Sequence, residues 1–107
     1  MRTVPQPGEV WLVDLGLVAK ARPALVLAAQ TDARLALASV VLITKQFEKT
    51  PYEVRLPRVP WLQEQSYINA QSIQPVKFTE FIRRASGKFD ARVISDVESA
   101  LKRWLKL

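Results

Sequence analysis

Two polar residues stand at the ends of apolar runs in the first half of the chain. Arg22 comes directly before the run at residues 23–27, and Thr44 directly follows the run at residues 41–43. If these runs are neighbouring strands, the guanidinium and the hydroxyl can meet at one edge of a sheet. A permanently charged donor beside a small hydroxyl suits the binding of a phosphodiester. The pair is therefore our candidate for a catalytic centre.

The chain contains neither histidine nor cysteine. The commonest general base, the commonest metal ligand and every Ser-His or Cys-His scheme are therefore missing. The carboxylates Asp14, Glu48 and Glu53 are scattered in the sequence, and no Asp-x-Asp motif occurs. This pattern does not favour two-metal nuclease chemistry. We expect a site without a metal or another cofactor.

The charge is basic and unevenly distributed. The chain has 16 Lys and Arg against 10 Asp and Glu, a formal net charge of +6. Residues 54–107 carry ten basic and five acidic residues, so a net charge of +5 lies in the second half. A basic surface favours a polyanionic partner such as RNA, DNA or an acidic protein. A solvated face that aids solubility is the alternative.

Length and composition predict one globular domain spanning residues 1–107. Apolar residues make up 49% of the chain, which is enough for a core. No apolar run approaches the roughly 18 residues that cross a membrane, so we expect no membrane association and a cytoplasmic location. Residues 1–7 lack a signal-type apolar stretch and read as an arm, because Pro5 and Pro7 block regular structure.

Apolar spacing predicts several short strands followed by one helix. Residues 90–107 place apolar side chains, among them Trp104, on one helical stripe. Asp90 is expected to cap this helix, and Gly87 to permit a tight turn into it. The expected strands span residues 10–15, 24–28, 35–43 and 52–56, with an extended stretch at 66–73, a turn at 30–33, and loops at 45–51 and 57–64.

This element order indicates an α+β, mainly β domain. We expect a small curled antiparallel sheet with the C-terminal helix packed against it. Trp11 and Trp104 are expected in the core, whereas Trp61, in a loop flanked by Pro57 and Pro60, is the tryptophan most suited to exposure. Trp61 can stack on a base or can cap the barrel, and the sequence leaves both open.

These motifs resemble the MazF/PemK (Kid) family, toxins of toxin–antitoxin pairs that cleave RNA. The family opening G-(D/E)-(I/V)-W-x-V-D is matched at residues 8–14, and R-P-x-x-V-L at residues 22–27. A third strand ending in P-x-T-T is matched in part at residues 42–45. The similarity continues through residues 52–54 and 69–73 into the last helix, so it covers about residues 8–107. It implies an SH3-like barrel of the CcdB/MazF type.

The resemblance assigns roles to the candidate residues. It implies that Arg22 is catalytic and that Thr44 contacts the phosphate beside it. Many members carry an acid just before the Gln of a short groove-lining motif, where this chain has Ala70. The identity of the general base therefore stays open. The residues expected to contact RNA are Lys45, Gln46, Trp61, Asn69, Gln71 and Ser72.

The function that the resemblance implies is a homodimeric, sequence-selective endoribonuclease acting on single-stranded RNA. Attack by the 2′-hydroxyl of the RNA needs no metal and no histidine, because the substrate brings its own nucleophile. An acidic antitoxin is the expected inhibitor. A CcdB-like toxin that binds gyrase without catalysis is one alternative. A degenerate nucleic-acid-binding member is the other, motivated by Ala70 and by the short, acid-free segment at residues 15–21.

Overall fold

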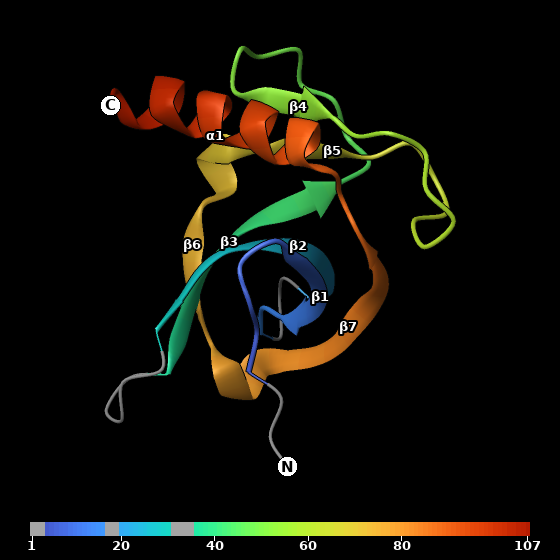
Figure 1. Cartoon of the computed structure of the whole chain (residues 1–107), viewed down its shortest axis with the longest axis vertical. Coiled ribbons are helices and arrows are strands. Elements are labelled where there is room, and N and C mark those ends of the chain that lie inside the picture. Colours follow the sequence, from blue (N-terminus) through green and yellow to red (C-terminus); the bar gives the residue numbers. More distant parts are fainter. Residues whose placement is uncertain (1–3, 17–19, 31–35) are drawn as a thin grey trace.

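The computed structural model describes residues 4–16, 20–30 and 36–107. The described chain forms seven strands, two short 3-10 helices and one α-helix (Figure 1). The strands are β1 (Glu9–Asp14), β2 (Ala21–Gln30), β3 (Leu37–Thr44), β4 (Glu53–Arg55), β5 (Tyr67–Asn69), β6 (Gln74–Lys77) and β7 (Phe81–Lys88). The helices are η1 (Ala70–Ser72), η2 (Phe78–Glu80) and α1 (Ala91–Leu105).

All strand pairs are antiparallel, in the order β4-β5-β3-β2-β1-β7, and β6 also pairs with β3. The sheet curls into a half-barrel, and α1 crosses it beside β4 and β5 (Figure 1). The expected curled sheet with a C-terminal helix is therefore confirmed. Among the described residues, no helix is long and apolar enough to cross a membrane.

The central strands β1, β2 and β3 are buried on both faces, because successive side chains pack alternately into two separate cores. One core lies under the helix and joins Leu25 and Ile43 to Val97 of α1. The other core fills the curl of the sheet and contains Trp11 and Val26. This double burial explains why these segments are continuous apolar runs in the sequence rather than alternating ones.

The helix matches its expected pattern except at its end. Asp90 caps it by accepting a hydrogen bond from the Val93 backbone N–H at 3.1 Å. The helix ends at Leu105, because Lys106 takes a left-handed conformation with φ of 59°. The expectation that Trp104 lies in the core was wrong. Its side chain is 39% exposed and touches Tyr52 edge-on, with ring centroids 5.3 Å apart.

Two strands that the sequence did not predict complete the sheet. Strand β6 contains Pro75 and so gives up one ladder hydrogen bond, and β7 is mostly polar, with the sequence FIRRASGK. Residues 66–73 are extended only over β5 and then turn into η1. Most of the turn expected at residues 30–33 lies outside the described residues.

Candidate active site

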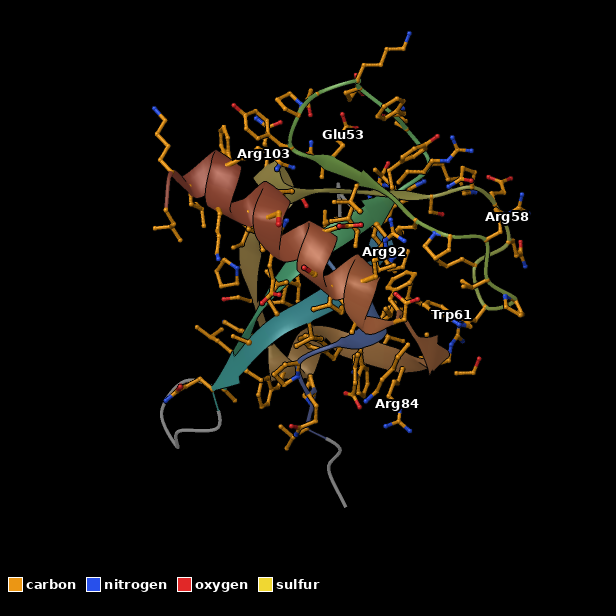
Figure 2. The ribbon with its side chains drawn as sticks, turned by 45° about the horizontal axis from the view of Figure 1, so that its top comes forward. Glu53, Arg58, Trp61, Arg84, Arg92 and Arg103 are labelled. Atoms are coloured by element: carbon orange, nitrogen blue, oxygen red, sulfur yellow. The ribbon has the colours of Figure 1, made fainter. Side chains whose placement is uncertain are left out.

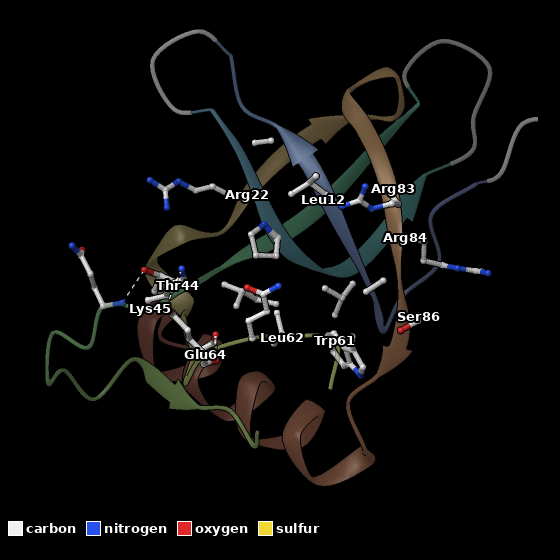
Figure 3. Close-up of a pocket in the computed structure, with 18 residues that line it drawn as sticks. Leu12, Arg22, Thr44, Lys45, Trp61, Leu62, Glu64, Arg83, Arg84 and Ser86 are labelled. Carbon is white, nitrogen blue, oxygen red and sulfur yellow. Dashed lines mark hydrogen bonds and ion pairs between the residues drawn. The ribbon is translucent and has the colours of Figure 1, made fainter. Parts of the chain in front are cut away.

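A groove with a volume of about 980 Å³ opens on one side of the half-barrel (Figure 3). Strands β1, β2 and β3, the loop at residues 57–66 and strand β7 supply its walls. Arg22 and Thr44 lie on one side of it, and Trp61 and Ser86 lie on the other. Its charged lining residues are Arg22, Lys45, Glu64, Arg83 and Arg84, so the groove is basic.

Strand register brings Arg22 and Thr44 to the same place. Ala24 of β2 pairs with Leu42 of β3. Arg22 lies two positions before Ala24, and Thr44 lies two positions after Leu42. Because the two strands are antiparallel, both residues lie at the same end of the pair. Side chains two positions apart share a face of a strand. Both residues line the large groove and also an adjoining cavity of about 260 Å³. The juxtaposition that the apolar runs suggested is therefore present.

The two side chains differ in what they already contact. The Thr44 hydroxyl oxygen accepts a hydrogen bond from the Gln46 backbone N–H at 3.2 Å, and its own O–H remains a donor. This bond also holds Gln46, which lines both cavities, at the start of the loop. Arg22 is exposed and makes no ion pair or side-chain hydrogen bond within the described part of the chain. Its donors are therefore available to an anion.

Lys45 reaches across to the loop that carries Trp61. Its ammonium lies 3.0 Å from a carboxylate oxygen of Glu64, and both side chains are largely exposed. Such exposed pairs contribute about 0–1 kcal/mol, so they exchange readily for another partner. The Lys45 charge therefore lies at the rim of the groove without being committed to the fold.

Asn69 and Ser72 line the smaller cavity, but both also support the backbone. The Asn69 side-chain oxygen caps η1 by accepting from the Gln71 backbone N–H at 2.9 Å. The Ser72 hydroxyl accepts from the Leu42 backbone N–H at 2.8 Å and donates to the Asn69 carbonyl at 2.7 Å. Gln71 is exposed and lies outside the lining of both cavities. Ala70 is fully buried and offers no proton acceptor there.

Trp61 is half-buried, so it both lines the groove and covers the core. Its ring centroid lies 4.9 Å from that of Phe89. Gly87 of β7 lies directly beneath it, since a Cβ there would clash with the Trp61 indole ring. The role of Gly87 is therefore to let Trp61 pack on β7, and the expected tight turn into the helix is not its role.

The groove wall formed by β7, on the side away from Arg22, carries an ion pair that the sequence did not predict. Glu9 is 5% exposed, and its carboxylate accepts from the Trp11 indole at 3.0 Å, the Gln6 backbone at 2.8 Å and the Arg84 guanidinium at 3.1 Å. Burial raises the pKa of Glu9, but these donors together outweigh it and hold the pKa below its ordinary value. Arg84 therefore belongs partly to the fold. Its neighbour Arg83 also lines the groove.

A second carboxylate organises the loop that follows Thr44. Glu53 accepts from the backbone of Glu48 at 2.8 Å, and from the backbone and hydroxyl of Thr50 at 2.7 and 2.9 Å. Burial acts to raise the pKa of Glu53, but these donors lower it overall. Arg103 of α1 fixes the same loop by donating to the Pro51 carbonyl at 3.0 Å (Figure 2).

Glu48 and Glu53 both line the smaller cavity with Arg22 and Thr44. These two carboxylates, which are scattered in the sequence, therefore meet at one cavity, because the loop folds back on Glu53. Within the described residues, no three acidic side chains gather as a metal site would require.

A sequence model of the PemK-like, MazF-like toxins of type II toxin–antitoxin systems matches residues 6–105. The match covers almost the whole chain, so the chain belongs to this family. A search of curated protein sequences finds no match.

Solved structures share the fold. An endoribonuclease in complex with its cognate antitoxin, from a mycobacterial species, superposes with a TM-score of 0.80 at 24% identity, and the match covers 96% of each chain. The Mycobacterium tuberculosis toxin MazF-mt6 gives a TM-score of 0.74 at 20% identity over 92% of this chain and 97% of its own. A MazE-MazF complex from Deinococcus radiodurans gives 0.74 at 20% identity over 98% of both chains.

Proposed function

We propose that this toxin is an endoribonuclease that cleaves single-stranded RNA in the groove beside Arg22 and Thr44. The observation that carries the proposal is the shared position of these two residues on both cavities, in a chain of the MazF-like family. The solved relatives described as endoribonucleases support the same reaction class. In this proposal the chain acts as a single domain in the cytoplasm, where its substrate is found.

In the proposed reaction the 2′-oxygen of the RNA forms a bond to phosphorus while the bond from phosphorus to the 5′-oxygen breaks. The leaving 5′-oxygen takes a proton from water, so the products carry a 2′,3′-cyclic phosphate and a 5′-hydroxyl. Arg22 stabilises the charge that develops on the phosphoryl oxygens, and the Thr44 hydroxyl donates to one of them. Neither the attack of the 2′-oxygen nor the stabilisation of charge by Arg22 and Thr44 needs a metal or another cofactor.

The 2′-hydroxyl proton needs an acceptor, and we assign that role to Glu48. Both oxygens of Glu53 already accept hydrogen bonds from its loop, and its pKa is lowered, so it is the poorer base. Glu48 lines the same cavity, and no hydrogen bond to its carboxylate is found in the described part of the chain. Glu48→Gln should therefore slow cleavage while leaving the loop in place, because the bond to Glu53 uses only the Glu48 backbone.

Other groove residues would hold the substrate. In this proposal Lys45 exchanges Glu64 for a phosphate, and Gln46 and Trp61 face the bound strand. Asn69, Gln71 and Ser72 contact RNA bases from the η1 side, with Gln71 the most exposed of the three. Because Asn69 and Ser72 also hold the backbone, substitutions there should affect stability as well as RNA binding.

The direct test is cleavage of a mixed single-stranded RNA by the purified protein in EDTA. Cleavage should persist, and the products should carry cyclic phosphate ends. Arg22→Ala is the matched negative control, with its fold checked by circular dichroism. An uncut RNA at micromolar wild-type protein would contradict the proposal and favour a toxin that acts by binding alone.

We also propose that the protein acts as a homodimer and is inhibited by an acidic antitoxin segment lying in the basic groove. Solved relatives in complex with antitoxins support such a partner. The toxin–antitoxin complex should weaken as salt rises, because charge pairs form across it. A strictly monomeric mass by light scattering at tens of micromolar would contradict the dimer. An antitoxin that binds tightly while cleavage continues would contradict this mode of inhibition.

A further inference from the structure

An exposed pair of stacked aromatic rings lies beside the candidate catalytic residues. Phe47 stacks on Tyr67 with ring centroids 4.8 Å apart and the ring planes within 12° of parallel. The Phe47 side chain is nevertheless 50% exposed. Tyr67 covers one face of the ring, so the opposite face is the one left for a further stacking partner. Phe47 contributes little to either core, so packing alone does not account for it.

Strand pairing places this ring pair beside the candidate reaction centre. Tyr67 of β5 is the register partner of Thr44 on β3, and Phe47 lies three residues after Thr44 in the chain. The pair is therefore anchored on the strand next to the one that carries Thr44. Two basic residues flank it, since Lys45 precedes it in the loop and Arg55 is the partner of Tyr67 on β4.

The loop holds Phe47 in place before any ligand arrives. The residue after it, Glu48, donates its backbone N–H to Glu53, and Thr50 is held by the same carboxylate. The residue before it, Gln46, donates its backbone N–H to Thr44. A ring fixed in this way loses little conformational freedom when a base stacks on it, so more of the stacking energy is retained as affinity.

We propose that Phe47, supported by Tyr67, is a stacking platform for one unpaired RNA base next to the scissile phosphate. The proposal rests on the proposed function and adds to it a specific subsite outside the cavity lining. Aromatic side chains that stack on bases are usual in proteins that bind single strands, and stacking accepts any of the four bases. The neighbouring Lys45 and Arg55 charges favour a nucleic acid over an apolar peptide as the occupant.

The test measures RNA binding separately from cleavage. Uncleavable 2′-O-methyl octamers carry the fluorescent base 2-aminopurine at each internal position in turn. Stacking on the wild-type protein should quench the fluorescence most strongly at one position. Phe47→Ala should remove that quenching and weaken binding about tenfold, within the range measured for base–aromatic stacking. Phe47→Trp should restore both effects, whereas Phe47→Leu, which keeps apolar bulk without a π face, should restore neither.

Leu105→Ala is the matched control, because Leu105 is 45% exposed at the end of α1 and lines neither cavity. It should bind like the wild type. Equal affinity and equal quenching in Phe47→Ala would overturn the proposal. So would a Phe47→Ala variant that changed only the oligomeric state or only antitoxin binding. If the wild type fails to cut RNA yet shows Phe47-dependent quenching, the platform stands and the proposed cleavage fails.

Discussion

Two arginines lie on opposite sides of one groove and differ in what holds them (Figure 3). Arg84 on β7 is bound to the buried carboxylate of Glu9 at 3.1 Å. Arg22 on β2 makes no ion pair with any residue that the structure describes. Both residues line the groove and add to its positive charge. One is committed to the fold, and the other has its donors available for a ligand.

The two groove walls that carry Arg84 and Arg22 differ in the same way. The Arg84 wall is tied to the scaffold by donors from three segments of the chain, which meet at Glu9. The Arg22 wall ends in a loop whose backbone is fixed by Glu53 while several side chains stay exposed. A fixed backbone with unpaired side chains is the arrangement that preorganised catalytic sites require. The partners of a charge thus indicate its role better than its position in the groove does.

The largest expected effect is on catalysis at Arg22. Arg22→Ala should remove the fixed charge at the scissile phosphate and cost about 3–4 kcal/mol of transition-state stabilisation, roughly a hundred- to a thousandfold in rate. Arg22→Lys should restore only part of the lost rate, because the compact ammonium of lysine cannot reproduce the planar, forked donors of the guanidinium. Single-turnover cleavage measures both variants, and urea unfolding should find their stability unchanged. Wild-type cleavage by a folded Arg22→Ala would make Arg22 a structural residue.

Arg84→Ala should give the opposite result. The buried Glu9 carboxylate would lose a charged donor, which should cost about 1–2 kcal/mol of unfolding free energy. Urea unfolding measures this loss. Arg83→Ala is the control, because Arg83 lines the same groove without an ion pair among the described residues, and it should change stability by less than about 0.5 kcal/mol. Equal stability losses at Arg83 and Arg84 would remove the distinction between the two walls.

Thr44→Val is the smaller test on the catalytic wall. The substitution is nearly isosteric and removes one hydroxyl, so the activation free energy of cleavage should rise by about 1 kcal/mol, which slows cleavage roughly fivefold. This loss is smaller than the one expected for Arg22→Ala. The hydrogen bond from the Gln46 backbone is also lost, but that group is exposed and can bond to water. Single-turnover kinetics on the same RNA would measure the effect. A larger loss than in Arg22→Ala would transfer the main catalytic role to Thr44.

The sequence predicted those features that depend on local pattern. Apolar residues at helical spacing and the Asp90 cap located α1, and continuous apolar runs located the doubly buried strands. The same runs placed Arg22 and Thr44 together, because β2 and β3 are consecutive antiparallel strands whose register fixes which residues lie opposite each other. Short-range information was sufficient for this part of the site.

The features that the sequence did not predict depend on contacts between distant segments. Strand β7 has no alternating apolar pattern, because the positions that pair with β1 carry residues such as Arg83 and Arg84. The partner of Glu9 lies 75 positions away in the chain. The gathering of Glu48 near Arg22 requires the turn that Glu53 imposes on its own loop. None of these contacts leaves a periodic signal.

The smallest expected effect is a loss of stability in acid, carried by one carboxylate on each wall. The pKa values of Glu9 and Glu53 are both lowered in the folded protein. Their contribution to stability is therefore fully present above the ordinary value of about 4.3 and is lost as the pH falls through the folded-state pKa. The difference in unfolding free energy between the wild type and Glu9→Gln should stay constant near pH 7 and shrink below about pH 4.

Glu53→Gln should behave in the same way with a smaller amplitude, because Glu53 lies in a partly exposed loop, whereas the Glu9 carboxylate is buried. Glu98→Gln, on the exposed face of α1, is the control and should not differ from the wild type at any pH. Urea unfolding between pH 7 and pH 2.5 provides the measurement. If the difference in unfolding free energy between the wild type and Glu9→Gln grew in acid, the pH dependence would have the opposite sign. Glu9 would then be buried at a net cost, and its ion pair with Arg84 would not be what stabilises that wall.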